Sequence, residues 1–227
     1  SLIRNKLLPA YVLLLGESAD DVLPGQLKVD ATAAIRADID PCWDEADFNP
    51  TIQIKPLLEE YCIPYEIALT RDVNSQSVIN LISQRSESVY VFSGFGGVLV
   101  GDSLLATGKR FLHVHGGYLP FYKGSTTNYF SLIDDNTMGA SSIFLNKEID
   151  SGAILMRKKF SPPLDRKEID HRYDSAARAM VLVETLQQYV KLGRWEFEVI
   201  NEDEDEAEVF YIIHPVLKHI AILDKGE

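Results

Sequence analysis

The segment Arg110-Phe-Leu-His-Val-His-Gly-Gly-Tyr-Leu-Pro-Phe-Tyr-Lys-Gly124 joins a strand-like run to a loop that is dense in turn residues. Side chains alternate along a strand, so His113 and His115 share one face while Val114 points to the other. The two glycines that follow allow the backbone to approach a ligand closely. The segment therefore predicts a pair of imidazoles at the carboxyl end of a buried strand.

Further strands and helices alternate on both sides of this segment. The patterns of apolar residues and of turn residues predict strands at 11–15, 65–69, 89–92, 110–115, 139–146, 153–160 and 209–213. They predict helices at 54–61, after a cap at Asn74 or Ser75, near Leu104, at 128–133 and, capped by Asp165, at 166–192. Such alternation is typical of an α/β fold with a mainly parallel sheet. In such sheets ligands bind outside the carboxyl ends of the strands, where the glycine-bearing loops after 11–15, 89–92 and 110–115 should meet.

Length and composition narrow the class of protein. A chain of 227 residues can form one sizeable domain, and we expect a catalytic domain over 1–192 with a short extension over 193–227 that packs on it or on a dimer partner. The net charge is −12, and half of this excess comes from the six acidic residues at 202–208, which we expect to form a solvated loop. Clustered bases are missing, which argues against a nucleic acid as substrate.

Two further patterns concern the cellular environment. No apolar stretch reaches about 18 residues, so we expect no membrane span. Cys42 and Cys62 have neither the number nor the spacing of a disulfide framework or a zinc cluster. We therefore expect reduced thiols and a cytoplasmic protein.

A carboxylate offers a partner for the histidines. Glu148-Ile-Asp-Ser-Gly152 follows the strand at 139–146 and predicts a tight turn at the same edge of the sheet. A carboxylate beside an imidazole raises its pKa and fixes its tautomer. Without the histidines, Asp150 would be interpreted as a turn or cap residue.

The stretch from His113 to Gly124 resembles the signature of the folate-dependent formyltransferases, which include glycinamide ribonucleotide, methionyl-tRNA and sugar N-formyltransferases. That family's pattern is Asn-x-His, then Leu-Pro, then an aromatic residue, a base and Gly, with Leu-Asp-x-Gly further on. His115 matches the catalytic histidine, and Ile149-Asp-Ser-Gly152 matches the aspartate loop. The resemblance runs from about Tyr90 to Phe160, roughly a third of the chain, and implies a Rossmann-like fold with helices flanking the sheet.

The chain departs from the family pattern at two places. His113 stands where the family has asparagine, and Gly116-Gly-Tyr118 stands where it has Pro-Ser-Leu or Asn-Ser-Leu. An asparagine always offers an amide donor, whereas a histidine donates only from a protonated ring nitrogen. Both changes affect the reacting centre.

The resemblance implies transfer of a formyl group from N10-formyltetrahydrofolate to the primary amine of a small molecule. As a hypothesis, an N–H of His113 stabilises the oxyanion with help from His115, while Asp150 orients His115 and removes the amine proton. The resemblance further implies a pterin pocket lined by Phe95, Gly96, Gly97, Val98, Leu99, Leu119, Asn146 and Glu148. It implies substrate contacts by Tyr118, Lys123, Ser125 and Thr126.

Several alternatives stay open. His-x-His with a distant aspartate is also a metal-ligand pattern, with His214 or His219 as a third imidazole, which would indicate a metal-dependent hydrolase. A catalytically silent folate-binding module is another interpretation. The residues after Lys123 could hold an anion at a helix N-terminus, or could simply cap that helix. For the acceptor we favour an amino sugar, either a nucleotide sugar or a nonulosonic acid, over methionyl-tRNA or a purine precursor.

Overall fold

The computed structural model describes residues 1–16, 43, 52–94, 98–200 and 208–223. The strands are β1 Val12–Gly16, β2 Tyr65–Leu69, β3 Val89–Phe92, β4 Arg110–His115, β5 Tyr122–Gly124, β6 Met138–Phe144, β7 Ile154–Phe160 and β8 Glu208–Phe210. The helices are α2 Ile54–Glu60, α3 Gln76–Ser83, α4 Asp102–Leu105, α5 Thr127–Asp134, α6 Asp174–Leu192 and α7 Pro215–Ile222, with a 3-10 turn η2 Arg166–Glu168 and a π-helical turn η3 Ile169–Tyr173.

The strands form one four-stranded sheet and two pairs. The sheet has the order β3-β4-β6-β7, and its β3 and β4 are parallel. From β4 onward the pairing is antiparallel, so β6 and β7 extend the sheet as a hairpin. The pairs β1-β2 and β5-β8 are both parallel. The predicted α/β fold is confirmed, but the expectation of a mainly parallel central sheet is corrected: only β3-β4 is parallel in this sheet, because β6 and β7 follow as a hairpin and not through crossover helices.

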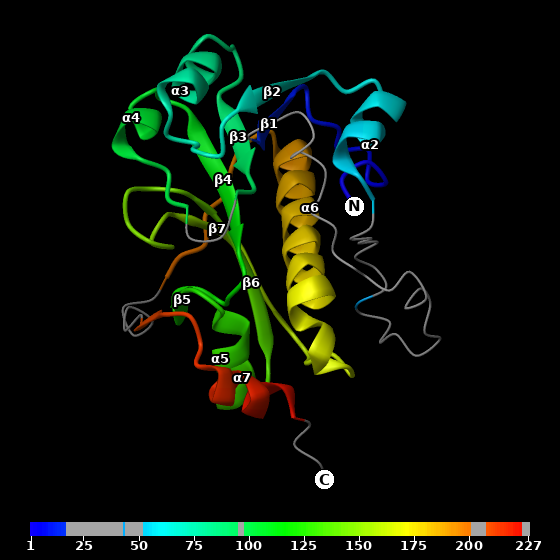
Figure 1. Ribbon diagram of the computed structural model, residues 1–227, viewed down its shortest axis with the longest axis vertical. Helices are drawn as coiled ribbons and strands as arrows, with labels where there is room; N and C mark the ends of the chain where they lie inside the picture. Colours follow the sequence, from blue (N-terminus) through cyan, green and yellow to red (C-terminus); the bar gives the residue numbers. More distant parts are fainter. Residues whose placement is uncertain (17–42, 44–51, 95–97, 201–207, 224–227) are drawn as a thin grey trace.

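Helices cover both faces of the sheet, and the alternation along β4 decides which residue faces which layer (Figure 1). Leu112 and Val114 pack in clusters that contain residues of α6, whereas Phe111 packs in a cluster with residues of α3 and α4. Each such large side chain, once buried, contributes about 1.5–3 kcal/mol. His113 and His115 alternate with Leu112 and Val114, so they lie on the face opposite α6, as expected.

The predicted long helix at 166–192 is wrong over its first eight residues. The α-helix begins at Asp174, and the residues before it form η2 and η3. The reason is tertiary: Arg166 is buried, and its guanidinium donates to the carbonyl of Ala221 at 3.2 Å and to Oδ1 of Asn136 at 2.6 Å. Asp165 nevertheless caps this segment by accepting from the N–H of Lys167, as predicted.

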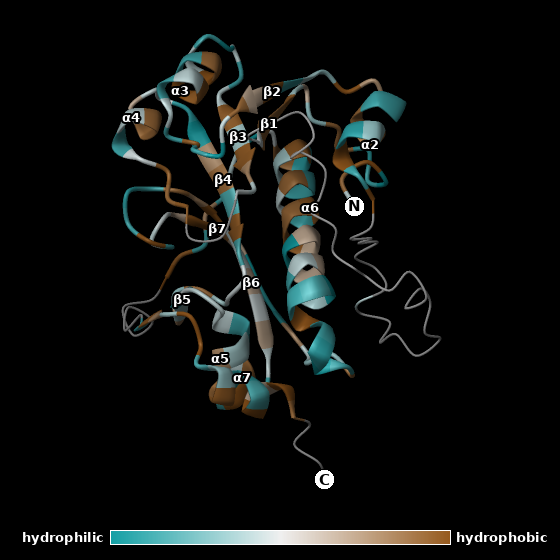
Figure 2. Cartoon of the chain, in the orientation of Figure 1, coloured by the Kyte–Doolittle hydropathy of each residue, from teal (hydrophilic) through white to brown (hydrophobic). Residues whose placement is uncertain are grey.

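The described C-terminal residues pack against the region after β4. β8 pairs with β5, which the sequence did not predict, and α7 lies beside α5 (Figure 1). Hydrophobic residues dominate α7 (Figure 2), and Ile213 and Ala221 are buried in the same cluster as residues of α5 and α6. In the segments that the structure describes, no helix combines the length and the hydropathy that a bilayer crossing requires.

Candidate active site

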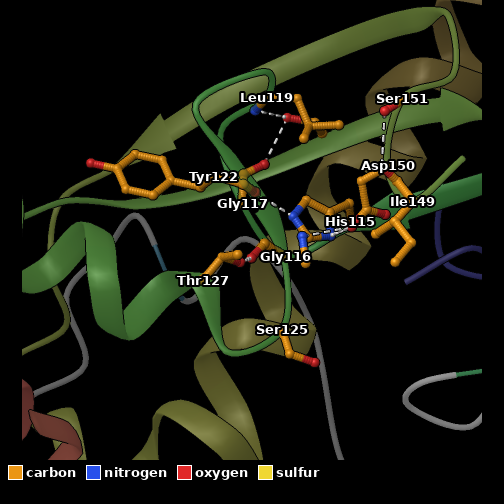
Figure 3. A network of polar contacts seen from close by, with 12 residues as sticks. His115, Gly116, Gly117, Leu119, Tyr122, Ser125, Thr127, Ile149, Asp150 and Ser151 are labelled. Atoms are coloured by element: carbon orange, nitrogen blue, oxygen red, sulfur yellow. Dashed lines mark hydrogen bonds and ion pairs between the residues drawn. The ribbon is translucent and has the colours of Figure 1, made fainter. Parts of the chain in front are cut away.

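His115 ends β4 and has an acceptor at each ring nitrogen. Its Nδ1 lies 3.4 Å from Oδ2 of Asp150, and its Nε2 lies 2.7 Å from the carbonyl oxygen of Tyr122 (Figure 3). The residue is only 6% exposed. The structure therefore brings His115 and Asp150 together, as the sequence analysis expects.

The contact with Tyr122 determines the position of one proton on the ring. A carbonyl oxygen only accepts, so Nε2 of His115 carries a hydrogen that it donates to Tyr122. Nδ1 faces a carboxylate oxygen of Asp150 at 3.4 Å, so both ring nitrogens of His115 lie next to acceptor oxygens of the protein.

The turn that carries Asp150 is strained in a way that fixes the carboxylate. Asp150 has a φ of 47°, in the left-handed region that aspartate tolerates better than most residues. Its Oδ2 also accepts from the N–H of Gly124 at 2.9 Å, which ties the turn to the loop after β4. A side chain at Gly152 would place its Cβ 1.7 Å from the carbonyl oxygen of Phe144, so only glycine fits there.

His113 lies two residues before His115 in β4 and pairs with Phe92, the last residue of β3. Its Nδ1 is 3.0 Å from the carbonyl oxygen of Phe92, so Nδ1 carries the hydrogen and donates it. Burial lowers the pKa of His113 below its ordinary value and outweighs the hydrogen bond to Phe92, which raises it; the charges of His115 and Arg178 lower it further, and that of Asp150 opposes them. A neutral ring in this tautomer has no second N–H, so the expected oxyanion donor is already used by Phe92.

Steric crowding explains why glycine follows His115 at two positions. A Cβ at Gly117 would lie 2.6 Å from the carbonyl oxygen of Tyr122 and 2.7 Å from Nε2 of His115. A Cβ at Gly116 would lie 2.3 Å from Oδ1 of Asp174. The departure from the family pattern therefore lets the loop pass close to the His115 ring and to the start of α6.

Residues that the sequence analysis did not single out support this loop. The hydroxyl of Thr127 donates to the carbonyl of Gly116 (Figure 3). Asn128, which is 3% exposed, accepts from the N–H of Gly139 at 2.7 Å and donates to Asp174 at 2.8 Å. The turn-rich composition after His115 is the only signal that could have located them.

Ser141 of β6 holds the middle of the loop. Its hydroxyl donates to the carbonyl of Gly117 at 2.7 Å and accepts from the N–H of Leu119 at 3.0 Å. The Leu119 side chain is fully buried and packs with Ile143 and Ile154. The expectation that this side chain lines a pterin pocket is therefore corrected, because it forms part of the core.

Of the other residues expected at the pterin pocket, the structure describes some and not others. Phe95, Gly96 and Gly97 lie outside the described residues. Val98 is half-buried and packs against the same hydrophobic cluster as Leu145. The side chain of Leu99 is 54% exposed.

Asn146 and Glu148 organise the turn before Asp150. The amide of Asn146 accepts from the N–H of Glu148 at 2.9 Å and donates to the carbonyl of Ser151 at 3.1 Å. Both residues are exposed. Asn146 therefore stabilises the conformation that presents Asp150, whether or not it contacts a ligand.

The residues expected to bind the acceptor spread over two places. The ring of Tyr118 stacks on Phe121 at 6.4 Å and lies under the cations of Arg157 and Lys159, along β7. Lys123 and Ser125 are half-buried beside β8.

Thr126 is the N-cap residue of α5, but its hydroxyl does not cap the helix. That hydroxyl donates to the carbonyl of Ser125 at 2.7 Å and accepts from the N–H of Ile213 at 2.9 Å. Thr126 thus holds the segment after β8 against the loop. The sequence therefore predicts the position of the N-cap correctly, but the expected hydrogen bond from the helix to the Thr126 side chain is not formed.

The metal interpretation lacks a third ligand in the described part of the chain, which contains no group of three or more metal-binding side chains. His214 and His219 are both exposed. Nδ1 of His214 accepts from the N–H of Val216 at 3.2 Å and so caps α7.

Known proteins resemble this chain in sequence. The sequence profile described as formyl transferase matches residues 50–184, which include all three candidate catalytic residues. A methionyl-tRNA formyltransferase from Desulforamulus reducens is 24% identical over 135 residues, covering 59% of this chain and 42% of that protein. The mitochondrial formyltetrahydrofolate deformylase 1 of Arabidopsis thaliana is 26% identical over 132 residues, covering 58% of this chain and 38% of that protein.

A solved structure has a similar fold over nearly its whole length. It is the formyltransferase PseJ from Anoxybacillus kamchatkensis, in complex with UDP-4,6-dideoxy-4-formamido-L-AltNAc and tetrahydrofolate. The two structures superpose with a TM-score of 0.54 at 14% identity, covering 95% of this chain and 93% of the other. This likeness supports the fold. The chain spans only 42%, 50% and 57% of three methionyl-tRNA formyltransferases that it matches.

Proposed function

Because this chain belongs to the formyl transferase family, we propose that it moves a formyl group from N10-formyltetrahydrofolate to a primary amine. The observation that carries the proposal is the His115–Asp150 pair, which is nearly buried at the carboxyl end of β4 and held by the glycine loop. A His–carboxylate pair in such a loop is the arrangement that acyl-type transfer needs for proton movement and charge stabilisation.

The roles of the pair follow from its contacts. Asp150 fixes the ring of His115 through Nδ1, and the backbone of Tyr122 fixes it through Nε2. The imidazolium form of His115 places a positive charge where the formyl oxygen becomes negative. Electrostatic stabilisation of this kind contributes about 2.7–4 kcal/mol for a single well-placed donor.

The donor would bind next to this pair. Val98 and Leu145 pack against one hydrophobic cluster, and the side chains of Leu99 and of Ile149, the neighbour of Asp150 in the sequence, are 54% and 43% exposed. Apolar side chains with backbone polar groups between them suit a flat pterin ring. The donor supplies the activated one-carbon group, and the chain supplies its orientation and the proton transfers.

For the acceptor we propose an amino sugar. Methionyl-tRNA formyltransferases are among the relatives, but recognition of a polyanion requires clustered bases, and this chain has a net charge of −12. A fold neighbour was solved with a nucleotide-linked formamido sugar, which makes this acceptor class the first to test.

The test is incubation with N10-formyltetrahydrofolate and a panel of amino sugars, nucleotide-linked and free, with methionyl-tRNA and a glycinamide ribonucleotide as comparison acceptors. The expected result is a mass gain of one formyl group on an amino sugar, lost in the His115→Ala variant. Formate release without any formylated product would instead indicate a hydrolase, like the deformylase among the relatives. Folate binding without either product would indicate a silent binding module.

A further inference from the structure

The acceptor amine must lose a proton during formyl transfer, and the contacts of the His115–Asp150 pair bear on where that proton goes. Nε2 of His115 donates to the carbonyl oxygen of Tyr122, and its Nδ1 lies 3.4 Å from Oδ2 of Asp150. Oδ2 of Asp150 also accepts from the N–H of Gly124. Both ring nitrogens of His115 and one oxygen of Asp150 are therefore already in contact with groups of the protein.

His113, in contrast, has one ring nitrogen that can accept a proton. Its Nδ1–H is committed to the carbonyl of Phe92, which leaves Nε2 with a lone pair and no proton in the neutral ring. The charged groups that act on this ring are His115, Asp150 and Arg178. Burial outweighs both the hydrogen bond to Phe92 and the charge of Asp150, so the pKa of His113 lies below its ordinary value and the ring is neutral near pH 7.

His113 also lies on the face of β4 that carries His115, two residues away. We infer that Nε2 of His113 is the base that accepts the proton of the attacking amine, an inference that rests on the proposed function. The family pattern has asparagine at this position, and an amide nitrogen donates a hydrogen bond but accepts no proton. The substitution therefore changes the kind of chemistry available at the position.

The proton transfers balance. As the acceptor nitrogen forms its bond to the formyl carbon, Nε2 of His113 takes one proton from that nitrogen and becomes an imidazolium. When the bond between the formyl carbon and the donor's nitrogen breaks, the electron pair stays on that nitrogen. His113 returns its proton there, so the ring ends neutral.

The experiment combines a pH profile with a measurement on the ring itself. For the wild type, kcat falls as pH drops through an apparent pKa below about 6.5, the ordinary histidine value, because protonated Nε2 accepts nothing. In His113→Asn, kcat drops by roughly 10²–10⁴-fold and this acid limb disappears, while the KM for the acceptor changes little. Nitrogen-15 NMR of the wild-type ring shows Nδ1 protonated and Nε2 unprotonated at pH 7.

Three results would overturn the inference. His113→Asn could keep the turnover of the wild type, which would indicate that residue 113 donates a hydrogen bond to the oxyanion, because asparagine can do the same. The acid limb could persist in that variant, or NMR could show Nε2 protonated in the neutral ring. The NMR result needs no active variant, so it stands if His113→Asn fails to fold. An inactive wild type with every amine would instead refute the proposed function, and the inference with it.

Discussion

Replacing Gly117 by alanine should damage the site through one methyl group. The added Cβ would meet the carbonyl oxygen of Tyr122 at 2.6 Å, Nε2 of His115 at 2.7 Å and the hydroxyl oxygen of Thr127 at 2.9 Å. Ordinary contact begins near 3.4 Å, so the loop or the ring has to move by about 0.8 Å. The cost of such overpacking is about 1–3 kcal/mol of stability.

The displacement separates the partners of the hydrogen bond that holds His115. A misplacement of about 1 Å can lower a rate by about 10²-fold, so we expect kcat to fall by that order. The measurement is kcat with the acceptor found in the panel, together with urea denaturation.

Gly108→Ala is the matched control. Gly108 has a φ of 75° with nothing within 4 Å of an added Cβ, so alanine there costs about 1–2 kcal/mol of backbone strain. It should lower stability by a similar amount and leave kcat unchanged. If Gly117→Ala keeps kcat within twofold of the wild type, the claim that this loop positions His115 is refuted.

Two further predictions concern charge and pH. Asp150→Asn removes the carboxylate that faces Nδ1 of His115, and kcat should fall by roughly 10²–10⁴-fold while circular dichroism stays unchanged; a variant with nearly full activity would remove Asp150 from the mechanism. Burial and a hydrogen bond to Glu66 raise the pKa of Tyr11 to about 12, so its folded state holds the proton more tightly than the unfolded chain. That contribution to stability is present below about pH 10 and is lost as pH rises toward 12; Tyr11→Phe should therefore show a shallower fall in unfolding free energy over this range, and equal slopes would contradict the assignment.

The sequence predicts much of the framework because apolar runs and turn residues determine short buried strands. The strands at 65–69, 89–92 and 110–115 appear with the predicted bounds as β2, β3 and β4. The meeting of His115 with Asp150 is predicted from the sequence on a wrong geometric ground: β6 runs antiparallel to β4, so its carboxyl end lies beside Leu112, and the turn that follows it has to fold back to bring Asp150 to His115.

The proton states of the site could not be predicted. They depend on the carbonyl oxygens of Phe92 and Tyr122, and every residue has a carbonyl, so no side-chain pattern marks these two. The strand predicted at 209–213 appears only in part, as β8 Glu208–Phe210, and its pairing with β5 was not predicted because these short strands are far apart in the sequence. The break before α6 depends on the buried contacts of Arg166 with Asn136 and Ala221, which are far apart in the sequence.

A structure of the protein with a hydrolysis-resistant N10-formyl folate analogue would test the central claim most directly. We predict that the formyl carbon lies at the carboxyl end of β4, with Nε2 of His113 facing the side from which an amine attacks and His115 next to the formyl oxygen. An analogue bound elsewhere on the chain, or bound with its formyl group turned away from both imidazoles, would contradict it.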